Sequence, residues 1–188
     1  MHLTLILGPM KSGKSFELIS HFAPLKYTDI PFALYQSAKN VRDEAIWSRS
    51  GITISAKKVA SLAEALESNI KVLGLDEAHL FDPENAKIVE RLLKMGVRVI
   101  ASGLDTDYQG RMFEIIKRLI ELGPAEIKYK RAVCERCRLP DAVYTQVFKM
   151  GEPLLGGAPA VIPEDGTYTY RPVCRRCFVR GERGTTQN

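Results

Sequence analysis

The sequence predicts an α/β fold, a parallel sheet with helices on both faces, followed by a small C-terminal domain. An apolar strand runs into a glycine-rich loop, and strand-length apolar runs then alternate with helical segments up to about residue 125. Four cysteines follow in two pairs. Near-continuous apolar strands separated by helices are typical of parallel sheets. The 188 residues suffice for one such domain and an appendage.

The first expected strand, residues 3–7, leads into a loop that matches the phosphate-binding pattern G-x-x-x-x-G-K-[ST], and a helix is expected over residues 15–22. Glycines let such a loop curl around a phosphate, and the helix adds its positive N-terminal end. Lys14 would reach the β- and γ-phosphates, and the Ser15 hydroxyl would bind Mg²⁺. We therefore predict a nucleoside triphosphate site. The expected loop residues are Gly8, Pro9, Met10, Lys11, Ser12, Gly13, Lys14 and Ser15.

The later elements of this domain follow from apolar periodicity and turn residues. Further strands are expected at residues 32–35, 52–54, 71–75 and 97–101. Helices are expected at residues 61–68, 83–95 and 113–122, the first opened by a Ser-x-x-Glu capping box and the second bracketed by proline and glycine. Residues 37–51 and 103–112 are expected to be loops.

A second acidic motif, Asp76-Glu77-Ala78-His79, follows the strand expected at residues 71–75. Asp76 is expected to hold Mg²⁺ directly or through water. Glu77 can accept a proton from the group that attacks the γ-phosphate, which is water in an ATPase and a substrate hydroxyl in a kinase. The letters D-E-A-H also occur in nucleic-acid helicases, but those enzymes need two RecA-like domains and this chain has room for one.

The cysteines form two C-x-x-C pairs, Cys134 with Cys137 and Cys174 with Cys177. Two such knuckles can complete a tetrahedral S₄ site for structural zinc. Disulfides are the alternative, which the lack of an export signal disfavours, and a redox C-x-x-C would need only one pair. A lobe of about fifty residues buries too little apolar surface to hold itself together, whereas structural zinc supplies about 10–16 kcal/mol. We predict one zinc ion bound by all four thiolates.

Composition and charge narrow the class of protein. The chain is 45% hydrophobic and 26% charged, as in ordinary globular proteins, and it has no apolar run near the ~18 residues of a membrane span. No signal-peptide pattern opens the sequence, so the expected location is the cytoplasm. Basic residues near both cysteine pairs contribute to the net charge of +5. They are compatible with a nucleic-acid surface, but we favour solvated charge.

The change from alternating strands and helices to short segments with paired cysteines sets the expected domain boundaries. Residues 1–130 are expected to form the nucleotide-binding domain and residues 131–180 the zinc-binding domain. The polar residues 181–188 are expected to form a frayed tail.

Four features occur together and in order: Met10 within the phosphate loop, the acidic motif followed by Phe81, the block G-L-D-x-D-Y-x-G-x-x-F at residues 103–113, and the cysteine pairs with Tyr170 four residues before Cys174. Through them the sequence resembles the cytosolic-type (type II) thymidine kinase family over residues 3–178. The resemblance implies a P-loop (RecA-like) domain, a zinc-bound lasso domain that closes over the nucleoside, and a homotetramer. It also implies ATP-dependent phosphorylation of the thymidine 5′-hydroxyl.

The resemblance further implies roles for single residues. Glu77 matches the general base and Arg42 an arginine near the 5′ end of the substrate. Residues matching the nucleoside pocket and the lasso are Met10, Leu80, Leu104, Tyr108, Phe113, Thr145, Leu154, Leu155, Gly156, Gly157 and Tyr170. Within this set, the backbone of residues 154–157 is expected to read the thymine edge.

This chain departs from the family pattern in several places. Asn40 stands where the family more often has Asp, and Leu80 and Tyr108 each replace a usual Phe. The largest departure is the insertion at residues 158–169, where the family passes from Gly-Gly to the tyrosine in a few residues. We expect this proline-bearing insertion to bulge outward and to return the chain to the pocket at Tyr170.

The sequence therefore predicts an enzyme that uses Mg·ATP to phosphorylate thymidine, with deoxyuridine as a further acceptor, giving dTMP for DNA precursor synthesis. Nucleic acid and membranes are not expected among its partners. Two alternatives stay open. One is a P-loop ATPase with a zinc ribbon that acts on nucleic acid, and the other is a non-catalytic nucleotide-binding module for which Glu77 would be dispensable.

Overall fold

A computed structural model describes residues 2–40, 45–47, 53–162 and 166–181 of the chain. Its main body is a parallel sheet of six strands in the order β5-β2-β6-β7-β1-β8. The strands are β1 (Leu3–Leu7), β2 (Phe32–Ser37), β5 (Lys57–Val59), β6 (Val72–Asp76), β7 (Arg98–Gly103) and β8 (Glu126–Tyr129). The predicted α/β class with a parallel sheet is confirmed.

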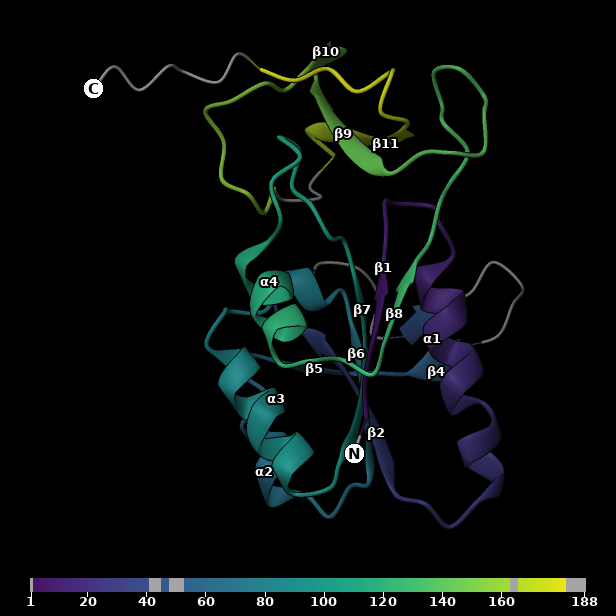
Figure 1. The fold of residues 1–188 in the computed structure, drawn as a ribbon, viewed down its shortest axis with the longest axis vertical. Coiled ribbons are helices and arrows are strands. Elements are labelled where there is room, and N and C mark those ends of the chain that lie inside the picture. The colour runs from purple at the N-terminus through teal and green to yellow at the C-terminus, as the bar shows by residue number, and fades with distance from the viewer. Residues whose placement is uncertain (1, 41–44, 48–52, 163–165, 182–188) are drawn as a thin grey trace.

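Helices cover both faces of the sheet (Figure 1). One face carries α1 (Lys14–Phe22), which is followed by the short 3₁₀ helix η1 (Pro24–Tyr27). The other face carries α2 (Glu64–Glu67), α3 (Asn85–Lys94) and α4 (Glu114–Glu121), and a second 3₁₀ helix, η2 (Ala78–Leu80), follows β6. Among the described residues, no helix is long and apolar enough to span a membrane.

The alternation of side chains along each strand divides the core between the two faces. In β1, Leu5 packs in the cluster beneath α3 and α4, whereas Ile6 packs against α1 with Leu18 and Phe22. Gly74 in β6 makes room for this second cluster, because a Cβ there would lie 2.8 Å from the Phe22 ring. Strands buried on both faces explain why the sequence reads as apolar runs.

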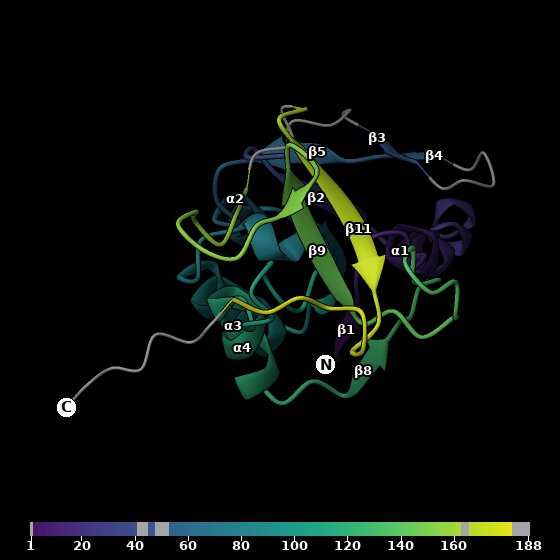
Figure 2. The same cartoon turned by 90° about the horizontal axis from the view of Figure 1, so that it is seen from above.

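The C-terminal lobe lies above the carboxyl ends of the parallel strands (Figures 1 and 2). It contains a three-stranded antiparallel sheet in the order β10-β9-β11, formed by β9 (Tyr144–Lys149), β10 (Glu152–Pro153) and β11 (Tyr168–Val173). Its core is small and consists of buried Ala132, Ala142 and Val173 together with two of the four cysteines. Ligands of open α/β sheets bind at the carboxyl edge that this lobe covers.

Several local expectations differ from the structure. Residues 37–51 were expected to be a loop and residues 52–54 a lone strand, but β3 (Ala45–Trp47) and β4 (Thr53–Ser55) form an antiparallel pair. The edge strand β5 was not expected. The expected helix at residues 61–68 is reduced to α2. The Ser61 hydroxyl accepts a hydrogen bond from the Ala63 N–H at 3.2 Å, and Asn85 Oδ1 accepts one from the Leu62 N–H at 2.8 Å. Side-chain capping by a distant residue therefore replaces the first turn.

Candidate active site and cysteine cluster

The phosphate loop follows β1 and leads into α1, as predicted. Gly8 has φ +146°, and a Cβ there would lie 2.4 Å from the Lys130 carbonyl oxygen. Gly13 has φ +80° directly before α1 begins at Lys14. Both positions require glycine, one for a close approach of two backbones and one for the left-handed conformation.

Two polar groups of this loop fit a bound phosphate. The buried Lys14 ammonium donates a hydrogen bond to the Pro9 carbonyl oxygen at 2.7 Å, so it folds over the loop. The Ser12 hydroxyl is buried and has no hydrogen-bond partner among the described residues. A buried polar group without a partner is costly. Phosphate oxygens would supply acceptors to both side chains, and the loop residues therefore fit a nucleotide.

Asp76, at the end of β6, lies against the phosphate loop. Its Oδ1 accepts hydrogen bonds from the Ser102 hydroxyl at 2.6 Å and the Ser15 hydroxyl at 3.4 Å, and its Oδ2 accepts one from Gln36 Nε2 at 3.3 Å. Burial, and next the Glu77 carboxylate, raise the pKa of Asp76 to about 6. A divalent cation would reverse this shift. The carboxylate and the Ser15 hydroxyl thus form a donor set that fits Mg²⁺.

Glu77 sits in an unusual backbone conformation at the start of η2. Its φ of 50° and ψ of 45° are left-handed, a region that costs a non-glycine residue about 1–2 kcal/mol. Its Oε2 lies 3.5 Å from His79 Nδ1, which also accepts a hydrogen bond from the Leu104 N–H at 3.3 Å. The His79 ring packs on Phe113 with 4.9 Å between centroids. Strain held by such neighbours is frequent at functional sites.

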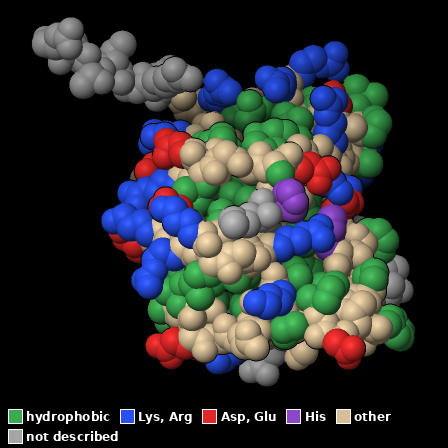
Figure 3. Space-filling view, turned by 60° about the horizontal axis from the view of Figure 1, so that its bottom comes forward, with side chains coloured by type: hydrophobic (Ala, Val, Ile, Leu, Met, Phe, Trp, Pro, Cys, Tyr) green, Lys and Arg blue, Asp and Glu red, His purple; other side chains and the backbone are tan. Residues whose placement is uncertain are grey.

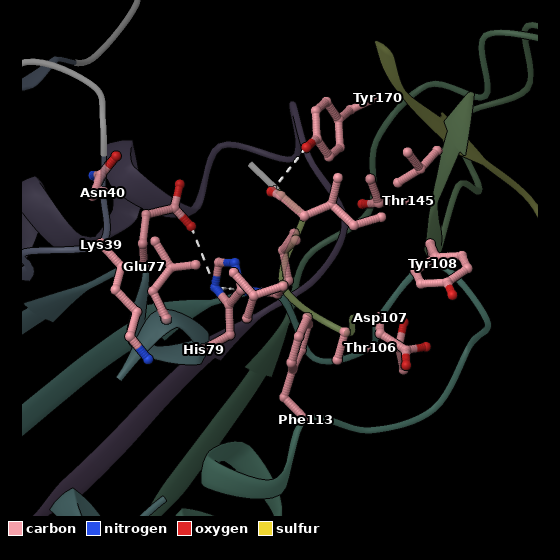
Figure 4. A pocket seen from close by; sticks show the side chains of 16 residues that line it. Lys39, Asn40, Glu77, His79, Thr106, Asp107, Tyr108, Phe113, Thr145 and Tyr170 are labelled. Carbon is pink, nitrogen blue, oxygen red and sulfur yellow. Dashed lines mark hydrogen bonds and ion pairs between the residues drawn. The ribbon is translucent and has the colours of Figure 1, made fainter. Parts of the chain in front are cut away.

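A cavity of about 400 Å³ opens between this edge of the sheet and the C-terminal lobe (Figure 4). Its lining comes from the ends of β2, β6 and β7 on one side and from β9, β11 and the segment before β11 on the other. The lining residues are Lys39, Asn40, Glu77, His79, Leu80, Leu104, Thr106, Asp107, Tyr108, Phe113, Thr145, Val147, Ala160, Val161, Ile162 and Tyr170.

The C-terminal lobe connects the cavity with the phosphate loop. Thr145, on β9, lines the cavity, and its Oγ1 accepts a hydrogen bond from the Met10 N–H at 3.0 Å. Beside it, the Lys11 ammonium forms an ion pair with Glu135 Oε1 at 2.5 Å. One strand of the small sheet therefore contacts both places where substrates would lie.

The four cysteines converge as the sequence predicted. Their sulfur atoms lie within 4.8 Å of one another, and Cys137 and Cys174 are 3.7 Å apart. Four ligands at the usual zinc–sulfur distance of about 2.3 Å stand about 3.8 Å apart in a tetrahedron. Burial raises the pKa of Cys134, but hydrogen bonds from backbone N–H groups outweigh it and lower the pKa to about 6. The cluster fits structural zinc.

Basic side chains are interspersed with acidic and apolar ones on the face drawn in Figure 3. Among the described residues, Arg118 forms ion pairs with Glu84 and Glu114, and Lys128 forms one with Glu17.

Comparison with known proteins identifies the family. The sequence profile described as thymidine kinase matches residues 1–178. The chain belongs to the thymidine kinase family. The thymidine kinase of Mycoplasma mobile is 32% identical, with 96% of this chain and 88% of the relative covered. That of Bacteroides thetaiotaomicron is 30% identical over 97% and 90%, and that of Monkeypox virus (strain Zaire-96-I-16) is 31% identical over 95% and 97%.

Membership of the thymidine kinase family confirms the resemblance and makes the chain a phosphotransferase. The structure places most of the residues matched to the nucleoside pocket at the cavity. They are Leu80, Leu104, Tyr108, Phe113, Thr145 and Tyr170, and Glu77, matched to the general base, lines the cavity as well. Arg42 lies outside the described residues. Met10 meets the cavity only through its backbone bond to Thr145.

The lasso segment differs from its expected arrangement in this chain. Leu154, Leu155 and Gly156 are not part of the cavity lining, and the Leu155 side chain is 43% exposed. Ala160, Val161 and Ile162 from the insertion line it instead, so the first part of the insertion turns inward rather than bulging out. Val161 also packs against the core beneath α3 and α4.

Other lining residues were missed at the sequence level. A signal existed for Val147, because alternate residues of a strand share a face and Thr145 was already a candidate. His79 belongs to the acidic motif. The residues of the insertion gave no signal, because their place depends on contacts with residues far away in the sequence.

Proposed function

We propose that this enzyme transfers the γ-phosphoryl group of ATP to the 5′-hydroxyl of thymidine, with deoxyuridine as a further acceptor, giving dTMP for DNA precursor synthesis. One observation carries the proposal. Asp76 and Glu77 are adjacent, and Asp76 contacts the phosphate loop while Glu77 lines the cavity. A phosphate held by the loop and a hydroxyl held in the cavity would therefore meet at Glu77.

The residues of the sheet edge would perform the chemistry. Lys14 would leave the Pro9 carbonyl and bind the transferred phosphate, and Ser15 with Asp76 would hold the metal. Bound Mg²⁺ would neutralise phosphate charge. Glu77 would accept the 5′-hydroxyl proton while that oxygen bonds to the γ-phosphorus and the bond to the β,γ-bridging oxygen breaks. ADP would leave with the electron pair of that bond.

The C-terminal lobe would bind the nucleoside. Phe113, Leu104 and Leu80 offer an apolar surface to the base, and Thr145, Tyr108 and Tyr170 close the cavity above it. We assign the backbone role expected of residues 154–157 to residues 160–162, because these line the cavity. Arg42 stays the proposed contact to the 5′ end.

The remaining assignments also belong to the proposal. One zinc ion per chain would be bound by Cys134, Cys137, Cys174 and Cys177, whose geometry supports it. A homotetramer and a cytoplasmic location are proposed from the family resemblance alone.

The direct test is a product assay. The purified protein is incubated with Mg·ATP and each deoxynucleoside in turn, and nucleoside monophosphate is measured. We expect dTMP from thymidine, a slower product from deoxyuridine, and none when Mg²⁺ is chelated. ATP hydrolysis that DNA or RNA stimulates, without any monophosphate, would instead identify a nucleic-acid-dependent ATPase.

A further inference from the structure

The cavity wall formed by residues 158–162 has no regular secondary structure. Such a segment cannot satisfy its own backbone groups, so it depends on partners elsewhere. Side chains supply them. Gln109 Nε2 donates to the Leu155 carbonyl oxygen at 3.1 Å, just before the segment, and the Tyr170 hydroxyl donates to the Ile162 carbonyl oxygen at 3.0 Å, drawn as a dashed line in Figure 4.

Tyr108 makes the fullest contact with this segment. Its hydroxyl donates a hydrogen bond to the Ala158 carbonyl oxygen at 2.8 Å and accepts one from the Ala158 N–H at 3.3 Å. A single phenol group thus binds both polar groups of one residue, using its donor and one of its acceptor sites. The ring itself is 4% exposed and lines the cavity. Phenylalanine at this position would keep the ring and lack the hydroxyl.

The loop that carries Tyr108 is itself held firmly. Asp107 Oδ1 accepts hydrogen bonds from the Gln109 N–H at 2.8 Å and the Arg111 N–H at 2.9 Å. Gly110 has φ +76°, and the space where its Cβ would stand is bounded by the Phe178 ring at 3.2 Å. Phe178 follows the last cysteine. A local turn and the contact with the cysteine lobe therefore hold the loop that carries Tyr108. From this loop the Tyr108 hydroxyl contacts the 158–162 segment.

We infer that Tyr108 is a positioning residue for the nucleoside: its hydroxyl sets the 158–162 segment so that Ala160, Val161 and Ile162 close the cavity. The inference rests on the proposed function of that cavity. Because the hydroxyl is hydrogen-bonded to Ala158, it acts on the nucleoside through the position of the 158–162 segment. Among the described residues, the hydrogen-bond partner of the hydroxyl is Ala158 and not a residue of the phosphate loop, so we expect it to act on nucleoside binding and to leave the chemical step and ATP binding alone.

The test is Tyr108→Phe, which removes only the hydroxyl, with Tyr144→Phe as the matched control. The Tyr144 hydroxyl accepts a hydrogen bond from Arg180 at 3.3 Å in the same lobe, but Tyr144 does not line the cavity. For Tyr108→Phe we expect a nucleoside KM about 5- to 10-fold higher, the loss of one or two hydrogen bonds. The kcat and the KM for ATP should stay unchanged. In Tyr144→Phe all three constants should stay unchanged.

Amide hydrogen exchange of the free protein gives an independent reading. A peptide that covers residues 154–162 should exchange faster in Tyr108→Phe than in the natural chain or in Tyr144→Phe, while peptides of β1 and β6 should not change. Unchanged exchange together with an unchanged nucleoside KM would overturn the inference, and so would a fall in kcat at constant KM. If the natural protein phosphorylates no nucleoside, the proposed function fails, and the exchange measurement still decides whether Tyr108 holds the segment.

Discussion

The two walls of the cavity are built in different ways. The wall with Glu77, His79 and Phe113 stands on β6, β7 and α4, whose apolar side chains belong to the large core beneath α3 and α4. The opposite wall, with Thr145 and the 158–162 segment, belongs to a lobe whose buried core includes two of the four clustered cysteines. Core packing therefore holds the first wall, whereas hydrogen bonds and the cysteine cluster hold most of the second, in which Val161 also packs against the large core.

This difference indicates that the two walls of the cavity have different functions. Groups that must be placed accurately for proton and phosphoryl transfer sit on the wall that packing makes rigid. The residues proposed to close over the nucleoside, Ala160 to Ile162, sit on the wall whose own apolar core is small, and regions of that kind open with lower free energy. A change at Glu77 should therefore act on kcat, and changes in the 158–162 segment or its partners should act on the nucleoside KM.

The largest effect is expected in the first wall. Glu77→Gln removes the proposed proton acceptor, and it should lower kcat by about 10²–10⁴-fold, the usual contribution of a general base. ATP binding, followed by equilibrium titration, should remain. Glu90→Gln on α3 is the matched control, because the Glu90 carboxylate is partly exposed, forms an ion pair with Lys94 and does not line the cavity. Turnover near normal in Glu77→Gln would remove Glu77 from the chemistry.

A smaller effect is expected in the second wall. Gly110→Ala places a Cβ against Phe178 in a left-handed conformation and so disturbs the loop that carries Tyr108. The nucleoside KM should rise about 5- to 10-fold, the size of a lost pocket contact. Gly123→Ala is the control, since its φ of +69° imposes a similar backbone cost of about 1–2 kcal/mol but nothing lies within 4 Å of its Cβ position. An equal KM change in both variants would contradict the coupling.

The smallest effect concerns a polar cluster of the sheet domain, formed by Glu17 on α1 with Lys128 and Lys130 at the end of β8. Hydrogen bonds from Lys128 and then Lys130 lower the pKa of Glu17 from 4.5 to about 2. A depressed carboxylate pKa stabilises the fold above the unfolded pKa, and this contribution disappears as the pH falls from 4.5 towards 2. Because the group is partly solvated, we expect Glu17→Gln to lower the free energy of unfolding by only about 1 kcal/mol at neutral pH.

Urea denaturation at neutral pH and again at acidic pH would measure this change. The difference between the natural chain and Glu17→Gln should shrink in acid. A loss several times larger would mean that the sheet domain depends on polar contacts as much as the C-terminal lobe does, and the contrast between the two walls would not hold.

The same contrast explains what the sequence could predict. The phosphate loop, Asp76 and Glu77 each follow an apolar strand, and glycine or acidic residues mark the point where that strand ends. These local patterns were sufficient to predict both the strands and the loops that follow them. The helix expected from Ser61 was wrong in length, because Asn85 caps the segment from a distance. The inward path of Ala160 to Ile162 depends on hydrogen bonds from Tyr108, 50 residues before Ala158, and from Tyr170, 8 residues after Ile162. No local pattern reports such contacts.

The most direct test of the central claim is amide hydrogen exchange with and without zinc. The protein is compared as purified with zinc, after removal of the metal by a chelator, and after zinc is restored. We expect removal to abolish protection in peptides of β9, β11 and residues 154–162 and to abolish thymidine binding, while β1, β6 and β7 keep their protection and ATP still binds. Simultaneous loss of protection in both walls, or retention in both, would contradict the claim that packing holds one wall and the metal site the other.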